Sequence, residues 1–230
     1  MKKVFICGDS FSSVDPMYPG LSWTERLANL LDAAEFINLS RPCSSNFFIR
    51  VQVDQALARQ ADYIIVHGTS SLRDEIRFKD IVPNDNFIDR FVDLNNTNNN
   101  NQDLSCYSFD SINHTTLFNS RQLTVLKQIY CDFFDLNLSI KKNQYIIEST
   151  LATLVASKVP FKFDQGGFEH PMYYNDTKKE YFKAYQQYIS DINLWSYAST
   201  SLRSPCFHIT DEAVHNTIAQ YYANSIKVAL

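Results

Sequence analysis

Short apolar runs alternate with amphipathic segments over the first part of the chain. Residues 3–8, 35–39 and 62–68 are each rich in Val, Ile, Phe or Leu, and polar or turn-forming residues bound them. Runs of this length and composition are typical of strands that are buried inside a parallel sheet. We therefore predict three buried strands in the N-terminal third of the protein.

The two segments between these runs carry apolar residues at helical spacing. Ser22 and Glu25 have the spacing of a capping box, which predicts a helix from Trp23 to about residue 32. Residues 46–60 repeat apolar positions every three or four residues, which predicts a second helix. The order β-α-β-α-β with short connections predicts an α/β fold, a three-layer α/β/α sandwich around a mainly parallel, flavodoxin-like sheet.

The middle of the chain departs from this pattern. Residues 78–120 are polar and irregular, and an Asn-rich tract occupies residues 95–101. We expect a solvent-exposed loop there; a lid or a partner-binding loop is the alternative. Because 230 residues suffice for one domain with a full core, we expect residues 1–230 to form a single domain with this polar excursion at about 78–120.

Helical patterning returns at residues 121–157, with a break near Leu136 and Asn137. Residues 159–163 then predict a late strand, followed by a turn at 164–167 and a helix at about 179–189. The last helix is predicted to start near Asp211. Its buried side is expected to carry Val214, Ile218, Tyr221, Tyr222 and Ile226.

Composition excludes several classes of partner and location. The net charge is −4 and no basic stripe is present, so we expect no binding to nucleic acid or to an anionic membrane. The N-terminal apolar run is too short for the hydrophobic region of a signal peptide, and no run approaches the length of a membrane span. A cytoplasmic or otherwise soluble protein without a signal peptide is the expectation.

The cysteine and histidine spacings indicate no metal site and no cofactor. The five cysteines stand at unrelated positions without a CxxC pair, and the histidines His67, His114 and His170 have no ligand spacing. No G-x-G-x-x-G motif follows the first predicted strand, which disfavours nucleotide binding of the flavodoxin-like kind.

The strongest chemical signal is Gly8-Asp9-Ser10 at the end of the first predicted strand. Ligands of open parallel sheets bind outside the carboxyl ends of the strands, so a serine in this turn is placed for use as a nucleophile. Asp9 can hydrogen-bond the turn and hold its shape. This motif, ahead of a helix that begins with a tryptophan, resembles the first block of the SGNH (GDSL-type) hydrolases. The resemblance extends over most of the chain through several short blocks.

The resemblance implies an oxyanion hole formed by three segments. The N–H of Ser10 is one donor, and Cys43 stands where the second block of the family has a glycine whose N–H is another. The third block keeps Gly68 but has Ser70 in place of the family's asparagine. Cys43 as a nucleophile is an alternative to a packed or spectator thiol.

Three charged residues follow the third block, and their role is open between two accounts. Arg73, Asp74 and Glu75 either line the rim of the cleft or form a solvated first turn of a helix.

The fifth block of the family places its catalytic histidine just before the last helix, and His208 occupies this position. The family's aspartate is replaced by Pro205, so the partner that orients His208 would be a backbone carbonyl, Ser204 or an acid from elsewhere. Thr210 is expected to cap the last helix, with Asp211 and Glu212 in its first turn. A surface or groove position is expected for His215.

The resemblance implies a serine esterase or acyl hydrolase that acts on a small ester or an acylated carbohydrate. In that hypothesis Ser10 and His208 are catalytic, Ser10, Cys43 and Ser70 bind the oxyanion, and Asp9 and Gly68 support the site. The alternative is a catalytically impaired SGNH-like scaffold that serves as a binding or assembly module. In that case the protein could form an oligomer. Acyl transfer to an acceptor other than water would use the same residues.

Overall fold

The computed structural model describes a set of ranges along the chain. These are residues 2–14, 18–31, 34–42, 44–70, 74–76, 105–107, 120–133, 135–164, 183–192, 194–197 and 209–230. The strands are β1 (Lys2–Cys7), β2 (Ala34–Asn38), β3 (Tyr63–His67), β4 (Asp74–Ile76), β5 (Ser105–Tyr107) and β6 (Phe161–Asp164). The α-helices are α1 (Trp23–Leu30), α2 (Asn46–Ala58), α4 (Ser120–Phe133), α5 (Leu136–Ser157) and α7 (Glu212–Ala229). Two short 3₁₀ helices are η3 (Lys183–Tyr188) and η4 (Leu194–Tyr197).

A parallel four-stranded sheet in the order β2-β1-β3-β6 forms the centre of the described structure. In the middle of β1, Val4 is paired with Phe36 of β2 on one side and with Tyr63 of β3 on the other. All five residues of β3 are buried, which is the burial expected of a strand covered on both faces. The three predicted N-terminal strands and the late strand are confirmed.

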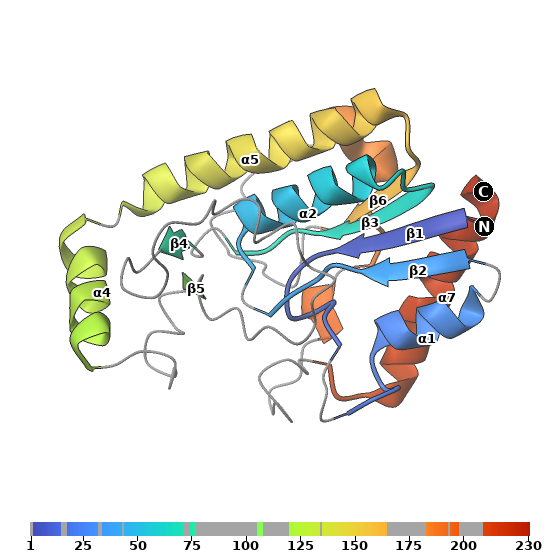
Figure 1. Cartoon of the computed structure of the whole chain (residues 1–230), viewed down its shortest axis with the longest axis horizontal. Helices are drawn as coiled ribbons and strands as arrows, with labels where there is room; N and C mark the ends of the chain where they lie inside the picture. Colours follow the sequence, from blue (N-terminus) through green and yellow to red (C-terminus); the bar gives the residue numbers. More distant parts are fainter. Residues whose placement is uncertain are drawn as a thin grey trace.

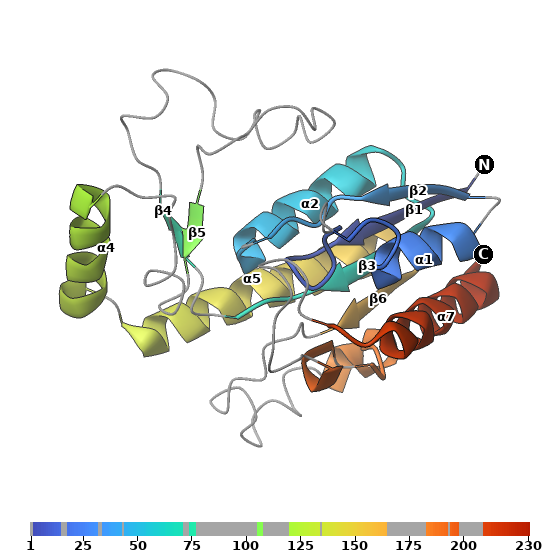
Figure 2. The same cartoon turned by 90° about the horizontal axis from the view of Figure 1, so that it is seen from below.

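Helices cover both faces of this sheet, as Figures 1 and 2 show. Alternate residues of β1 point to opposite faces: Val4 and Ile6 belong to the core cluster under α1 and α7, whereas Phe5 and Cys7 belong to the cluster under α2 and α5. The fold is therefore the predicted three-layer α/β/α arrangement.

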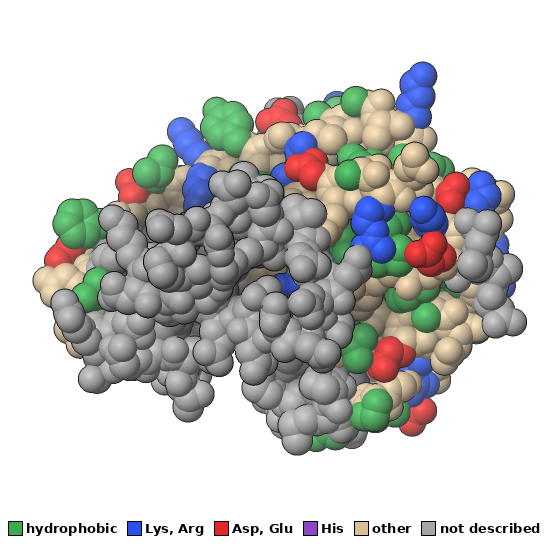
Figure 3. Space-filling model, in the orientation of Figure 1, with side chains coloured by type: hydrophobic (Ala, Val, Ile, Leu, Met, Phe, Trp, Pro, Cys, Tyr) green, Lys and Arg blue, Asp and Glu red, His purple; other side chains and the backbone are tan. Residues whose placement is uncertain are grey.

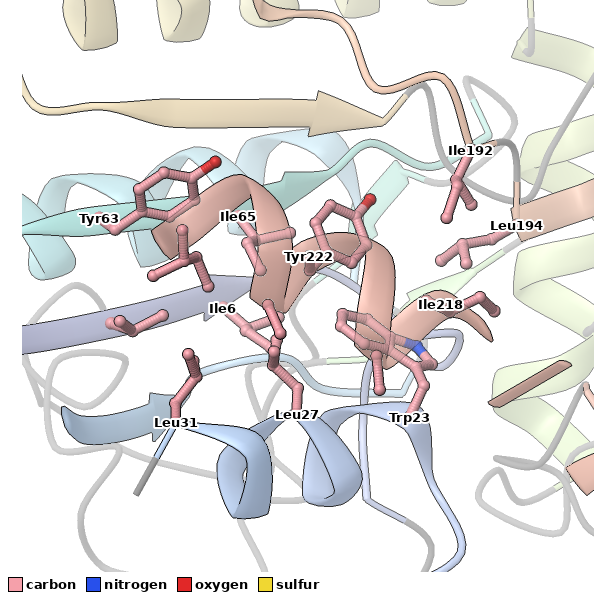
Figure 4. Packing of buried hydrophobic residues seen from close by; sticks show 14 of the residues in the cluster. Ile6, Trp23, Leu27, Leu31, Tyr63, Ile65, Ile192, Leu194, Ile218 and Tyr222 are labelled. Carbon is pink, nitrogen blue, oxygen red and sulfur yellow. The ribbon is translucent and has the colours of Figure 1, made fainter. Parts of the chain in front are cut away.

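The core under α1 and α7 is built on large side chains (Figure 4). Trp23 and Leu27 of α1 pack with Ile218 and Tyr222 of α7 over Ile6 of the sheet. The capping box predicted for α1 is present: the Ser22 hydroxyl accepts from Glu25 N at 3.2 Å, and the Glu25 carboxylate accepts from Ser22 N at 3.1 Å. This cap fixes where α1 begins and hence where Trp23 enters the core.

Several local predictions need correction. Of the helix predicted at about 179–189, residues 183–188 form the 3₁₀ helix η3, from which Tyr185 and Tyr188 pack against the core cluster under α2 and α5, and residues 179–182 lie outside the described residues. Asp74 and Glu75 lie in β4 and not in a helical turn; β4 pairs in antiparallel fashion with β5, inside the predicted excursion. The break between the two central helices is confirmed, since α4 ends at Phe133 and α5 begins at Leu136.

The cap of the last helix is also corrected. Asp211 is the N-cap of α7, and its side chain accepts from Ala213 N at 2.8 Å, so Thr210 precedes the cap instead of forming it. None of the helices in the described ranges is long and apolar enough to cross a membrane.

Candidate active site

The end of β1 is held by a side chain of α2. Gly8 N donates to Gln52 Oε1 at 2.7 Å, and Gln52 Nε2 donates to Gly8 O at 3.2 Å. The buried amide of Gln52 thus pairs with both backbone groups of Gly8, as a neighbouring strand would. Gly8, which precedes the Asp9-Ser10 turn, is therefore held in place by α2.

Asp9 closes the turn that carries Ser10. Its carboxylate is fully buried; Oδ1 accepts from Phe11 N at 3.0 Å and Oδ2 accepts from Thr69 Oγ1 at 2.7 Å. Its backbone carbonyl accepts from the N–H groups of Ser12 and Ser13 at 3.1 and 3.0 Å. Ser10 therefore lies in a rigid helical turn at the carboxyl end of β1, with 4% of its surface exposed.

The segment after β3 is held next to this turn by Asn46, the first residue of α2. Thr69 N donates to Asn46 Oδ1 at 2.8 Å, and Asn46 Nδ2 donates to Thr69 O at 2.9 Å and to Asn143 Oδ1 at 2.7 Å. Ser70, the candidate oxyanion donor, follows directly and is buried. Two amide side chains thus anchor the backbone that would present Ser70.

A buried polar chain runs from the nucleophile turn to α7. Ser12 Oγ is hydrogen-bonded to His67 Nδ1, His67 Nε2 lies 3.1 Å from the Tyr222 hydroxyl, and Ser190 Oγ lies 3.2 Å from that same hydroxyl. His67 is fully buried, and this burial lowers its pKa to about 3, so the ring is neutral at physiological pH. These hydrogen bonds were not predicted from the sequence, although a histidine at the end of an apolar strand signals a buried polar group.

His215 connects the two ends of the chain instead of lying on the surface. Trp23 N donates to His215 Nδ1 at 2.9 Å, and His215 Nε2 donates to Ile209 O at 2.8 Å. The indole N–H of Trp23 donates to Phe11 O at 2.9 Å. The expected surface or groove position for His215 is wrong, because both ring nitrogens are used in buried bonds.

These bonds bring the flanks of the two candidate catalytic residues together. Phe11 follows Ser10, Ile209 follows His208, and both belong to the core cluster under α1 and α7. The turn that leaves β1 and the segment that enters α7 therefore approach the same part of that core. His208, Cys43, Ser204, Pro205 and Arg73 lie outside the described residues.

Within the described ranges, no group of three or more His, Cys, Asp or Glu side chains could hold a metal ion. Cys7 is buried between β1 and the helices, and burial raises the pKa of its thiol far above the usual value. Cys7 is therefore a packed thiol and not a reactive one.

Known structures match the chain over its whole length. The psychrotrophic esterase EstA from Pseudoalteromonas sp. aligns with 99% of this chain and 98% of its own, at 11% identity and a TM-score of 0.54. TesA aligns with 100% of both chains at 11% identity and a TM-score of 0.51. A G-D-S-L family protein from Desulfitobacterium hafniense aligns with 98% of this chain and 99% of its own at 10% identity and a TM-score of 0.50.

The chain has the SGNH-hydrolase fold. At 10–11% identity these likenesses concern the fold alone, and they agree with the parallel sheet and its two helical layers. No protein-family model and no curated protein matches the sequence. In the SGNH fold of this chain, Ser10 lies at the carboxyl end of β1, directly after the Gly8-Asp9 pair that the Gln52 and Thr69 side chains hold.

Proposed function

We propose that this protein is a serine ester hydrolase in which Ser10 is the nucleophile and His208 the general base. The observation that carries the proposal is the rigid turn around Ser10 at the carboxyl end of β1. This turn is held by Gln52 of α2, which bonds Gly8, and by Thr69 after β3, which bonds the Asp9 carboxylate and is itself held by Asn46. A preorganised nucleophile at the ligand-binding edge of a parallel sheet is what acyl transfer needs.

The packing at the start of α7 supports His208 as the base. Through Trp23 and His215, hydrogen bonds connect Phe11, next to Ser10, with Ile209, next to His208. Phe11 and Ile209, the sequence neighbours of the two candidate catalytic residues, lie in one core cluster, which supports the pairing of Ser10 with His208.

The reaction proceeds in two balanced steps. Ser10 Oγ forms a bond to the ester carbonyl carbon while its proton passes to a ring nitrogen of His208. The ester C–O bond then breaks, and His208 returns the proton to the leaving alcohol, which leaves an acyl-serine. Water attacks the acyl-serine in the same way, with His208 as base and then acid, and releases the carboxylic acid.

The negative charge on the carbonyl oxygen would be bound by the N–H groups of Ser10 and Cys43 together with the Ser70 hydroxyl. A hydroxyl supplies one donor, in place of the two N–H bonds of an asparagine side chain. Loss of one good oxyanion donor typically costs roughly 100- to 1000-fold in rate. We therefore expect slow turnover of simple esters.

A small ester or an O-acetylated carbohydrate is the proposed substrate class. EstA is an esterase, and an acetyl xylan esterase, Est2A from Butyrivibrio proteoclasticus, aligns with 99% of this chain and 64% of its own at a TM-score of 0.50. The EstA structure is of the enzyme inhibited by monoethylphosphonate, which makes a phosphonate a suitable probe.

A fluorophosphonate labelling experiment tests the proposal. Wild-type protein should be labelled once, at Ser10, and hydrolyse p-nitrophenyl acetate, whereas Ser10→Ala and His208→Ala should lose both properties. Ser149→Ala, an exposed serine on α5, is the matched control and should behave as wild type. Labelling of folded wild-type protein that is no stronger than that of Ser10→Ala would refute catalysis and favour the binding-module alternative.

A further inference from the structure

Arg41 lies beside the nucleophile turn, just after β2. Its backbone N–H donates to Gly8 O at 3.2 Å, and its carbonyl accepts from Ser44 N at 3.3 Å and from Ser44 Oγ at 3.0 Å. Gly8 is two positions before the candidate nucleophile Ser10, so this hydrogen bond joins the Arg41 backbone to the start of the nucleophile turn. Arg41 also lies just beyond the carboxyl end of β2, and ligands of parallel sheets bind at this edge of the sheet.

The charge of Arg41 is not matched within the described structure. Other arginines have partners there: Arg26 pairs with Glu212, Arg50 pairs with Asp54, and Arg59 lies over the ring of Phe5. No described carboxylate pairs with the guanidinium of Arg41, although the residue is half-buried and burial lowers the pKa of its guanidinium. A partly desolvated cation without a counter-charge has a strong tendency to bind an anion.

The neighbouring residue supplies a second unused polar group. Ser40 Oγ is buried and has no hydrogen-bond partner in the described part of the protein. Buried hydroxyls are normally bonded, so such an atom next to a candidate catalytic site indicates a position where a ligand completes the bonding. Figure 3 shows a small area of Lys or Arg atoms near the middle of this face of the molecule.

We propose that Ser40 and Arg41 form a subsite for a carboxylate group of the substrate, so that the preferred esters carry a negative charge near the scissile bond. This inference rests on the proposed ester hydrolysis and specifies its substrate class. A guanidinium binds a carboxylate through two parallel N–H bonds, and a serine hydroxyl can donate a third.

A singly charged group fits this subsite better than a phosphate dianion. Arg41 is the only basic residue between Ala34 and Phe48, so the segment offers one positive charge. Half-esters of short dicarboxylic acids, such as a hemisuccinate, place one carboxylate a few bonds from the ester carbonyl. They are therefore suitable probes.

Binding is tested without catalysis in the Ser10→Ala background. Calorimetric titration with monoethyl succinate should show binding that weakens roughly 10- to 100-fold when Arg41→Gln is added, because a charge-assisted pair is lost. Arg50→Gln, which removes a half-buried arginine that is paired with Asp54 on α2, is the matched control and should leave the affinity unchanged. Equal binding by the Arg41→Gln and Arg50→Gln proteins, or no binding by the Ser10→Ala protein itself, would overturn the inference.

Turnover gives the second measurement. In wild-type protein the mono-p-nitrophenyl ester of succinic acid should have a higher kcat/KM than p-nitrophenyl acetate, and Arg41→Gln should remove this preference while leaving the acetate within about twofold. Arg41→Lys should restore part of it, since the charge returns without the two-pronged geometry. If Arg41→Gln lowers kcat/KM equally on both esters, the subsite is contradicted. If wild-type protein hydrolyses neither ester although the Ser10→Ala protein binds monoethyl succinate, only the proposed hydrolysis is contradicted.

Discussion

The hydroxyl of Ser12 is hydrogen-bonded to Nδ1 of His67, so the turn that holds Ser10 is tied to the last residue of β3. On the other side of the ring, Nε2 of His67 faces the hydroxyl of Tyr222 on α7. Trp23 packs against His67 edge-on, with the ring centroids 5.1 Å apart. One buried imidazole therefore joins the first strand, the third strand and the last helix.

His67 should make the protein sensitive to acid. Its pKa is about 3 in the folded protein and near 6.5 when unfolded, so the unfolded state binds more protons between these values. The free energy of unfolding therefore has its full value above pH 6.5 and decreases progressively as the pH falls toward 3. Between pH 7.5 and 4.5 this group alone should lower the free energy of unfolding by about 3 kcal/mol.

Urea unfolding over this pH range, on wild-type protein and His67→Gln, measures that contribution. The wild-type curve should fall more steeply with acid than the variant curve, whatever the variant's stability at pH 7.5. An NMR titration of wild-type protein should find the His67 ring neutral from pH 8 to 5. A ring that titrates near pH 6.5 would show that the imidazole is not buried as described.

Tyr222→Phe should destabilise the protein through the same polar chain. The hydroxyl of Tyr222 is the partner of both His67 Nε2 and Ser190 Oγ, and the residue is fully buried. Removing it leaves buried polar atoms unsatisfied, at a cost of about 1–3 kcal/mol in the free energy of unfolding. Tyr221→Phe is the control: its hydroxyl bonds Asp191 at the exposed surface and should matter by less than about 0.5 kcal/mol. Equal effects in urea unfolding would contradict the prediction.

Gly8→Ala should damage the Ser10 turn. A Cβ at position 8 would lie 2.9 Å from Ser12 Oγ and 3.2 Å from His67 Cβ, both inside the buried chain. We expect a loss of about 1–3 kcal/mol in stability together with a marked loss of fluorophosphonate labelling. Gly20→Ala provides the contrast: its φ of +77° makes a side chain unfavourable by about 1 kcal/mol, but no atom lies within 4 Å, so labelling should persist.

The sheet was predictable because its signals are local. Each buried strand is a short apolar run, and the Ser22–Glu25 pair marks the start of α1 in four consecutive residues. His215 could also have been placed correctly, because it precedes Ile218 by three positions and Tyr222 by seven, on the buried face of α7. Its polarity suggested a surface position, but two buried hydrogen bonds stabilise it in the core.

The polar chains around the candidate site were not predictable. The Ser12–His67 and His67–Tyr222 bonds join residues 55 and 155 positions apart, and the Asn46–Asn143 bond joins residues 97 positions apart. Periodicity reports which face of an element is buried, but not which polar atoms meet across elements. The strand at Asp74–Ile76 was not predictable for the same reason, because its partner strand Ser105–Tyr107 is distant in the chain.

The Asn46 clamp gives a test of how the oxyanion segment is positioned. Asn46 bonds both backbone groups of Thr69, whereas Asn143 bonds Asn46 and Ser139 O but makes no bond to Thr69 that the structure describes. Both asparagines are buried, so Asn46→Ala and Asn143→Ala should each cost about 1–3 kcal/mol of stability. Only Asn46→Ala should release the Thr69-Ser70 backbone.

Steady-state kinetics on p-nitrophenyl acetate separates the two asparagines. Because Ser70 would act on the charge that develops in the transition state, Asn46→Ala should lower kcat by roughly tenfold or more with little change in KM. Asn143→Ala should leave kcat within about threefold of wild type after correction for the folded fraction. If both variants lower kcat equally at equal stability, Asn46 contributes to the fold alone and the segment after β3 needs no clamp to serve the reaction.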